Sequence, residues 1–240
     1  SNRPKCMIEI FGKSLLEHQI ECFRKCGIND ITVVTGYLGD TISIPNVNYI
    51  QNNEYQKTNM VYSLFCGEKI LDDTVIVSYG DIIFEKNILE KLLKIQSDLS
   101  VVIDTNWNEY WMKRFDNPID DAESLRLDND GYIKNIGQKV TNIDEIEGQY
   151  IGLMKFQDKG VDLIKKYYDI AKQESIKGKN LLNPNTSFEK SFMTDFLQYL
   201  INSGCKIQSI PTQNGWLELD SINDYELYNK MYKNGEISKF

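Results

Sequence analysis

Histidine is almost absent from this chain of 240 residues, in which His18 is the only one. A single histidine leaves little room for a histidine-based catalytic triad or a histidine-rich metal site. His18 falls on a helix that the apolar pattern predicts, where a packing or surface role is the better interpretation. The sequence therefore favours chemistry that needs no imidazole base.

Paired cysteines and long apolar runs are also lacking. The five cysteines form no CxxC motif. Cys22 and Cys26 stand four positions apart in a helical pattern, so a zinc pair is one interpretation, but a core face in a reducing cytosol is favoured. The longest apolar runs have the length of strands, which predicts no transmembrane helix and no signal peptide. We therefore expect a cytoplasmic protein that does not contact a membrane.

Positive charge is in deficit. Lysine and arginine together number 27 against 35 aspartates and glutamates, which gives a net charge of -8 and a pI near 4.9. A nucleic-acid-binding protein needs a basic face that neutralises phosphates, so this class is disfavoured. A single nucleotide remains a suitable ligand, because a few local lysines and a divalent metal can hold its phosphates.

What the chain has instead is an alternation of apolar strands and amphipathic helices. Near-continuous apolar strands between such helices predict a mostly parallel sheet that is covered on both faces. The expected fold class is therefore α/β, with a Rossmann-like three-layer arrangement. The expected strands are 31–35, 47–50, 74–78 and 99–104, and the expected helices are 14–26, one that opens at Asn59, and 85–96.

The pattern changes after residue 105. Residues 124–140 read as a hairpin around Asn129-Asp130-Gly131, a turn sequence that favours positive φ. We interpret residues 1–240 as one nucleotide-binding domain with this β-hairpin region inserted. The other elements expected here are a strand at 149–156, helices near 159–173 and 189–202, a strand at 206–210, and a last helix that begins at Ser221 with Asp224 in a capping box.

The first residues that could carry chemistry lie in the segment Arg3-Pro4-Lys5-Cys6-Met7. A lysine beside a rigid proline can place a fixed cation where a phosphate binds. The alternative is a solvated lysine on the surface ahead of a strand. Taken alone, this segment favours the alternative.

Carboxylates follow two strand-like runs. Gly80 and Asp81 come directly after TVIVS-Tyr79, and in open parallel sheets the ligand crevice lies beyond the carboxyl ends of the strands. A glycine there lets the backbone approach a ligand, and an aspartate is well placed for Mg²⁺. Glu218 and Asp220 share one face of an extended run and repel each other unless a cation lies between them. With Asp81 they could complete a Mg²⁺ site; a plain turn and solvated edge acids are the alternatives.

A third candidate segment is WNEYWMKR, which contains Trp107, Trp111 and Arg114. The two tryptophans stand four positions apart and so share one face of a helix. They either pack into the core or wall a pocket that holds a cationic group by cation–π attraction. Core packing is the favoured interpretation.

The order of these segments carries more information than any one of them. PKCM…GKSLLEHQIE, GINDITVVTGYLGD, VIVSYGDIIF and WLELDSINDYE follow one another, and this order resembles the nucleoside-triphosphate transferase family of sugar-phosphate nucleotidyltransferases over essentially the whole chain. TNMVYSL, the tryptophan-rich segment, EGQYIGLMKF and NGWLELD are most similar to the small-metabolite cytidylyltransferases. Those enzymes act on phosphocholine, 2-aminoethylphosphonate, phosphoglutamine and related compounds.

The resemblance implies a role for each matching position. Lys5 would contact the triphosphate and stabilise charge at the α-phosphate. Asp81 and Asp220 would hold Mg²⁺, with Glu218 as a further ligand. The implied site is therefore catalytic Lys5, Asp81 and Asp220; nucleotide-binding Lys5, Asn59, Ser63, Gly80 and Asp81; and acceptor-binding Trp107, Trp111, Arg114 and Tyr150.

The sequence departs from the family pattern at its start. A Gly-rich loop of the form GxGxRLxPLT precedes the Pro-Lys motif in the family, whereas this sequence opens with Ser1-Asn2-Arg3-Pro4-Lys5. SNRPK reads as the continuation of such a loop. We therefore expect the domain to lack its first strand and this loop in the chain as given.

The implied reaction transfers CMP from CTP to a small phosphorylated or phosphonylated amine or amino acid and releases pyrophosphate. Because the acceptor is already anionic, positioning and electrostatic stabilisation by Lys5 and Mg²⁺ carry the catalysis without a general base. The expected partners are CTP and the acceptor, with a homodimer left open. The expected setting is the biosynthesis of a cell-surface polysaccharide or a phospho-metabolite.

Two alternatives remain. One is a nucleotidyltransferase that uses UTP or dTTP with a sugar 1-phosphate, although the chain ends soon after WLELD without β-helix repeats, which favours a small acceptor. The other is an inactive relative that binds a nucleotide as a regulatory subunit. Lys5, Asp81 and Asp220 argue against this second alternative, and the missing loop argues for it.

Overall fold

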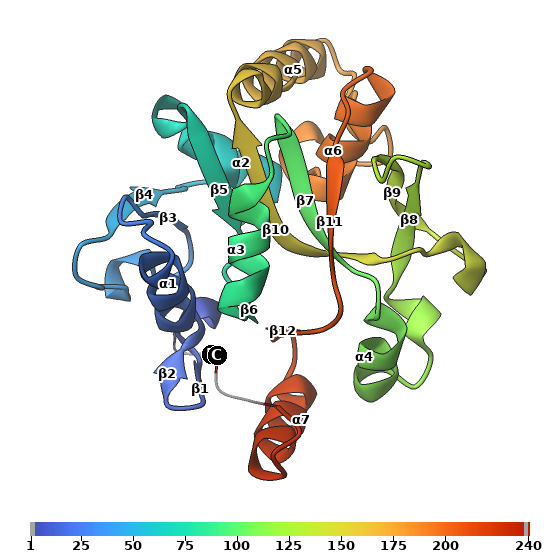
Figure 1. Ribbon diagram of the computed structural model, residues 1–240. Coiled ribbons are helices and arrows are strands. Elements are labelled where there is room, and N and C mark those ends of the chain that lie inside the picture. The colour runs from blue at the N-terminus through green and yellow to red at the C-terminus, as the bar shows by residue number, and fades with distance from the viewer. Residues whose placement is uncertain (1–2, 238–239) are drawn as a thin grey trace.

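A four-stranded sheet lies at the centre of the computed structural model, which describes residues 3–237 and 240 (Figure 1). Its order is β11 (Gln208–Thr212), β7 (Leu99–Asp104), β10 (Gln149–Gln157) and β5 (Thr74–Ser78). β11 runs parallel to β7, whereas β10 is antiparallel to both of its neighbours. The expectation of a mostly parallel sheet needs correction here, because the sheet is mixed.

The direction of β10 follows from where the inserted region leaves and rejoins the sheet. β7 finishes at Asp104, β10 starts at Gln149, and these two residues pair with each other. The chain thus returns at the end where it left, without the crossover that parallel strands need. The intervening segment contains α4 (Trp107–Arg114) and an antiparallel hairpin of β8 (Glu123–Leu127) with β9 (Ile133–Lys139), which confirms the expected hairpin.

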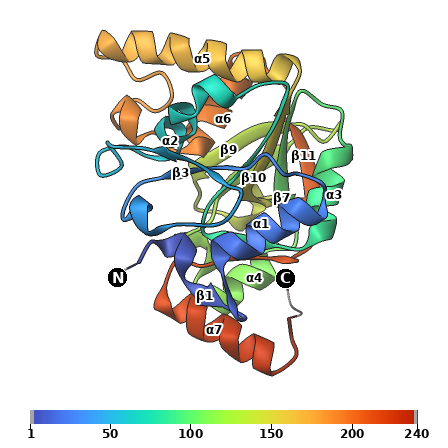
Figure 2. The ribbon, with the colours of Figure 1, turned by 90° about the vertical axis from the view of Figure 1, so that its left-hand side faces the viewer.

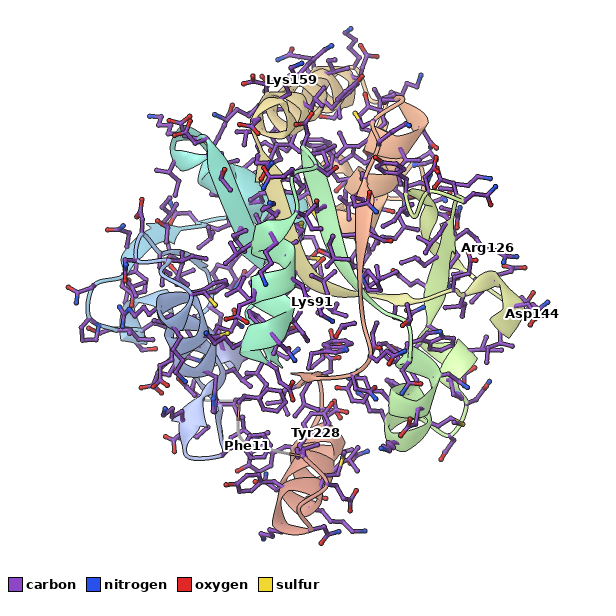
Figure 3. The ribbon with its side chains drawn as sticks, in the orientation of Figure 1. Phe11, Lys91, Arg126, Asp144, Lys159 and Tyr228 are labelled. Atoms are coloured by element: carbon purple, nitrogen blue, oxygen red, sulfur yellow. The ribbon has the colours of Figure 1, made fainter. Side chains whose placement is uncertain are left out.

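Helices cover both faces of the sheet, which confirms the three-layer arrangement. In β7, Val102 belongs to the apolar cluster of α1 (Leu15–Lys25) and α3 (Lys86–Lys94), whereas Val101 and Ile103 belong to the cluster on the opposite face. This alternation is the period of two that a strand imposes. Figure 2 shows α3 and α6 on opposite sides of the sheet, and charged side chains such as Arg126, Asp144 and Lys159 lie at the periphery (Figure 3). The second cluster includes residues of α2 (Met60–Cys66), α5 (Lys159–Ile176) and α6 (Met193–Asn202).

Two helices begin with the capping signals that the sequence shows. The Ser14 hydroxyl accepts from the Glu17 backbone at the start of α1, and Ser221 does the same for Asp224 at the start of α7 (Ile222–Lys233). Helix α6 begins at Met193 and not near 189, because residues 191–192 are extended. No helix in the described part of the chain has the length and apolar character to cross a membrane.

Short strand pairs flank the central sheet. β3 (Thr32–Thr35) pairs in parallel with β4 (Asn48–Gln51), and β6 (Ile82–Phe84) pairs antiparallel with β12 (Trp216–Glu218). A small hairpin of β1 (Glu9–Ile10) and β2 (Lys13–Ser14) precedes α1. Within the described residues β5 pairs only with β10, and β3 only with β4. Residues of both β3 and β5 line a cleft of about 1350 Å³.

A bulge in β10 shapes the end of β5. The register shifts between Tyr150 and Met154, and Gly152 within this stretch has a φ of +82°. The Gly152 carbonyl accepts from the Tyr79 backbone N–H at 2.9 Å. A Cβ at Gly152 would lie 2.7 Å from the ring of Tyr79. The bulge therefore fixes the position of Tyr79, which lies between the end of β5 and Gly80.

We expect Gly152→Ala to lower the free energy of unfolding by about 2–4 kcal/mol, because alanine disfavours positive φ and its methyl group meets the Tyr79 ring. Gly178→Ala is the matched control. Gly178 also has a positive φ, of +83°, but nothing lies within 4 Å of its Cβ position, so its loss should be about 1 kcal/mol. Urea denaturation measures both, and equal losses would contradict a steric role for Tyr79.

Candidate active site

One strand pair brings Asp81 and Asp220 together, although 139 positions separate them. Asp81 directly precedes β6, and Asp220 lies two residues beyond β12. In this antiparallel pair Glu218 stands opposite Ile82, and the Leu219 N–H donates to the Asp81 carbonyl at 2.9 Å. The two carboxylates therefore meet near the carboxyl end of β5.

Lys5 connects these two carboxylates. It opens a short 3-10 turn (Lys5–Met7) directly after the buried Pro4. Its Nζ donates to Asp81 Oδ2 at 2.8 Å and to Asp220 Oδ1 at 2.6 Å. The structure thus places all three expected catalytic residues in direct contact.

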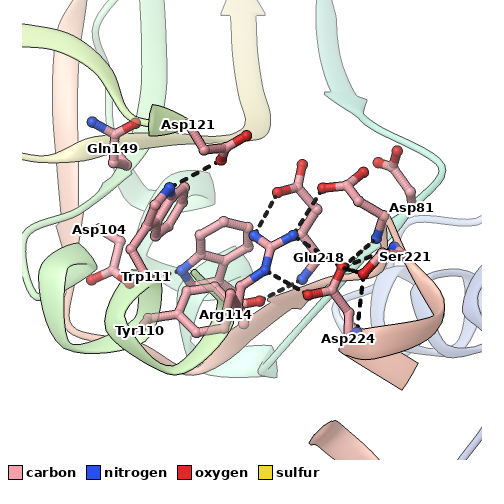
Figure 4. Close-up of polar contacts among 12 residues, drawn as sticks. Asp81, Asp104, Tyr110, Trp111, Arg114, Asp121, Gln149, Glu218, Ser221 and Asp224 are labelled. Carbon is pink, nitrogen blue, oxygen red and sulfur yellow. Dashed lines mark hydrogen bonds and ion pairs between the residues drawn. The ribbon is translucent and has the colours of Figure 1, made fainter. Parts of the chain in front are cut away.

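A second cation, Arg114, contacts the acidic residues of this cluster from the interior of the protein (Figure 4). Its side chain is 0% exposed. Nη2 donates to Asp220 Oδ2 at 2.9 Å, and Nη1 donates to Glu218 Oε2 at 3.0 Å. Nε donates to Asp224 Oδ1 at 2.9 Å. A buried guanidinium has to be paired, and these three carboxylates pair it.

Asp224 and two tyrosines fix the backbone that carries the acidic residues. Oδ2 of Asp224 accepts from the Asp220 N–H at 3.0 Å. The Tyr110 hydroxyl accepts from the Glu218 N–H at 2.9 Å, and the Tyr228 hydroxyl donates to the Glu218 carbonyl at 2.6 Å. Both peptide groups of Glu218 are therefore bound by side chains, which restricts where its carboxylate and that of Asp220 can lie.

The charges in the cluster shift one another's protonation. Burial alone lowers the pKa of Lys5, but Asp81 and Asp220 outweigh it and raise that pKa. Burial alone raises the pKa of Asp220, but Lys5 and Arg114 outweigh it and lower that pKa. At Glu218, burial and then repulsion by Asp220 raise the pKa to about 7. The cluster therefore favours the ionised form of Asp220 and the protonated form of Glu218 more than water does.

The arrangement fits a divalent cation that Asp81 and Asp220 share. Oδ1 of Asp81 is buried and has no hydrogen-bond partner, so one oxygen suited to a metal is unsatisfied. Mg²⁺ is commonly held by one or two carboxylates together with substrate phosphates. Across the residues that the structure describes, no group of three or more His, Cys, Asp or Glu side chains is arranged to hold a metal. Glu218, the further metal ligand that the resemblance implies, is bound to Arg114 through Oε2.

The cleft beside β5 connects the cluster to the other expected nucleotide-binding residues. Asn59, Ser63, Gly80 and Asp81 all line this cleft. Asn59 also caps α2, since its Oδ1 accepts from the Met60 N–H at 2.9 Å. These four residues therefore surround one cleft, and Lys5 lies beside the cleft through its contact with Asp81.

Sequence reasoning missed Asn52, which is 2% exposed. Its Nδ2 donates to Ser63 Oγ at 3.1 Å and to Thr58 Oγ1 at 2.9 Å, and its Oδ1 accepts from the Glu54 N–H at 3.0 Å. Asn52 thereby ties the loop ahead of α2 to the helix. The signal was available, because Asn52 directly follows β4 just as polar residues follow β5.

A sequence model of the MobA-like NTP transferase domain matches residues 1–122, which contain Lys5 and Asp81. The chain belongs to this family. A CTP:phosphoglutamine cytidylyltransferase of Campylobacter jejuni is 35% identical over 241 residues, which cover 94% of this chain and 91% of that protein. A choline-phosphate cytidylyltransferase of Streptococcus pneumoniae is 29% identical over 115 residues, which cover 46% of this chain and 50% of that protein. The expected resemblance is confirmed, and the protein is a nucleotidyltransferase.

Solved structures agree on the fold. The CTP:phosphocholine cytidylyltransferase from Streptococcus pneumoniae superposes with a TM-score of 0.69 at 19% identity, covering 96% of this chain and 90% of that one. The inositol-1-phosphate CTP transferase from T. maritima gives a TM-score of 0.68 at 17% identity, covering 96% and 88%. The α/β nucleotidyltransferase fold is therefore confirmed.

The two tryptophans of this MobA-like NTP transferase belong to its hydrophobic core. Trp107 and Trp111 are each 4% exposed, and their rings meet edge to face with centroids 6.0 Å apart. Trp111 Nε1 donates to Asp121 Oδ2 at 3.1 Å. The Arg114 side chain is buried as well. None of the three side chains therefore offers an exposed surface for the acceptor-binding role that the resemblance implies.

Tyr150 has a different environment. Its half-buried ring meets Tyr79 edge to face, with centroids 5.7 Å apart, and Tyr79 stands two residues before Asp81. Burial raises the pKa of both tyrosines, and the charge of Glu123 acts in the same direction. Glu123 is an exposed residue, although partial burial of its carboxyl group raises the pKa of that group.

The pKa of Glu218 predicts how stability depends on pH. The folded-state pKa of about 7 exceeds the ordinary value of 4.5, so the folded protein binds more protons than the unfolded chain between these pH values. The free energy of unfolding should therefore fall as pH rises from about 4.5 to 7 and level off above that range. Glu218→Gln should remove this fall, as measured by chemical denaturation at pH 5, 6, 7 and 8. Glu226→Gln, on the exposed face of α7, should keep the wild-type profile; identical profiles for both variants would contradict the assignment.

Proposed function

We propose that this chain is a cytidylyltransferase that transfers CMP from CTP to a small phosphorylated or phosphonylated amine or amino acid. The observation that carries the proposal is the contact of Lys5 Nζ with both Asp81 and Asp220 beside the cleft. Two relatives that are cytidylyltransferases support cytidine as the base.

The proposed step is an in-line displacement at phosphorus. An oxygen of the acceptor's phosphate or phosphonate attacks the α-phosphorus of CTP, the bond to the oxygen that bridges to the β-phosphate breaks, and pyrophosphate leaves. No proton has to be removed from the acceptor. Lys5 offers its charge to the α-phosphate, and Mg²⁺ held by Asp81 and Asp220 would offset the charge of the triphosphate. His18 takes no part, because its Nε2 is engaged with the Ile10 carbonyl at 2.8 Å.

For the acceptor we propose the side of the site formed by Tyr79, Tyr150 and Glu123. An ammonium group over an aromatic ring gains about 0.5–2 kcal/mol, and an exposed carboxylate adds charge complementarity. This position replaces the tryptophans, whose faces are buried. Because a relative that is 35% identical over 94% of this chain is a CTP:phosphoglutamine cytidylyltransferase, phosphorylated amino acids are the first acceptors to test, ahead of phosphocholine, phosphoethanolamine and 2-aminoethylphosphonate.

Pyrophosphate release tests the function. We expect the full-length protein with Mg²⁺ to release pyrophosphate from CTP, and not from ATP, GTP, UTP or dTTP, when a phosphorylated amine or amino acid is present. Lys5→Ala should lower kcat by about a hundredfold or more, because a lost charge contact at the reacting phosphate costs several kcal/mol.

Lys13→Ala is the matched control for this assay. Lys13 Nζ pairs with Glu21 Oε2 at 2.6 Å on an exposed face, so its loss should change kcat less than about threefold. Turnover with UTP or dTTP and a sugar 1-phosphate would favour the first alternative. Tight nucleotide binding without turnover would favour a regulatory relative.

A further inference from the structure

The two oxygens of Asp220 are held by two different cations. Arg114 Nη2 contacts Oδ2 at 2.9 Å, and Lys5 Nζ contacts Oδ1 at 2.6 Å. Lys5 also contacts Oδ2 of Asp81 at 2.8 Å. Its ammonium group therefore lies between the same two carboxylates that the proposed function assigns to Mg²⁺.

The two cations differ in how firmly they are held. Arg114 is 0% exposed and is bound by Glu218 and Asp224 as well, so removing it would leave buried carboxylates unpaired. The Lys5 side chain is 40% exposed and stands on a three-residue turn. Only the Oδ1 side of Asp220 can therefore be exchanged, and Lys5 is the group that has to move.

We propose that Lys5 acts as an exchangeable internal cation that competes with the divalent metal for Asp81 and Asp220, while Arg114 is a positioning residue that leaves one oxygen of Asp220 for this exchange. In the nucleotide-free protein Lys5 occupies the bridging position and weakens metal binding. A triphosphate then offers the ammonium group a stronger anionic partner, and the metal takes the two carboxylates. The inference rests on the proposed function in assigning the metal to this pair.

The charges around the site agree with an exchange. Four carboxylates, of Asp81, Glu218, Asp220 and Asp224, face two cations in this cluster, so a divalent ion finds an excess of negative charge. What opposes it is position, because an ammonium group and a metal ion cannot share the same carboxylate oxygen at contact distance. Removing the ammonium should therefore strengthen metal binding even though it removes activity. A general loss of structure would instead weaken metal binding.

Direct Mn²⁺ binding tests the proposal without an assay of activity. The dissociation constant of Mn²⁺ is measured by electron paramagnetic resonance on the nucleotide-free protein at pH 8. Lys5→Met should bind Mn²⁺ at least about tenfold more tightly than the wild type. Lys5→Arg keeps the charge and should bind as weakly as the wild type, and Lys13→Met should also leave the affinity unchanged. Adding Asp81→Asn to Lys5→Met should abolish the gain, which locates the ion.

Equal or weaker Mn²⁺ affinity in a folded Lys5→Met protein would overturn the proposal, as would a gain that survives Asp81→Asn. If Lys5→Met does not fold, Lys5→Gln provides the same loss of charge with a shorter side chain. The binding result is independent of the base and the acceptor. A tenfold gain in a protein that fails the CTP assay would leave the exchange standing and reject the cytidylyltransferase, whereas turnover without the gain would do the reverse.

Discussion

The buried guanidinium of Arg114 is the contact on which the site depends. It comes from α4 and binds Glu218 on β12, Asp220 beyond that strand, and Asp224 on α7. The three carboxylates lie close together in the chain, at least 104 positions from Arg114, and they would repel one another without a cation among them. Because a buried charge tolerates no lost partner, α4 and the segment from β12 to α7 can adopt only arrangements that keep all of these bonds. The position of Asp220 beside Asp81 is one consequence.

The aromatic residues of α4 support the acidic cluster through this contact. Tyr110 and Trp111 lie with their rings within 5.6 Å of the Arg114 guanidinium, and Trp107 and Trp216 pack around them. They keep water away from the ion pairs, which strengthens every charge interaction in the cluster. The same exclusion of water raises the pKa of Glu218. The packing of these aromatic side chains in the core therefore also determines the electrostatics of the acidic cluster.

Much of this could be predicted from local patterns. β5 and β7 have the bounds that their apolar runs predict, and both serine capping boxes form because their signals lie within one turn. The meeting of Asp81 and Asp220 was expected from their places after two strands, and the antiparallel pair β6–β12 produces it. The direction of β10 could not be predicted, because a strand buried on both faces has the same apolar pattern whichever way it runs. Nor could the partners of Arg114, which stand at least 104 positions away, since no short-range signal encodes them.

Lys5 and Arg114 suit different roles in this cluster because their side chains differ chemically. The planar fork of Arg114 can satisfy several carboxylates at once and stays charged when buried, which suits a permanent structural cation. A compact ammonium on a flexible stem, as in Lys5, can leave one pair of oxygens for another anion at little structural cost. Exchanging the two residue types would place the fixed cation where mobility is needed. In this arrangement the buried Arg114 orients Asp220 through Oδ2, and the more exposed Lys5 holds Oδ1.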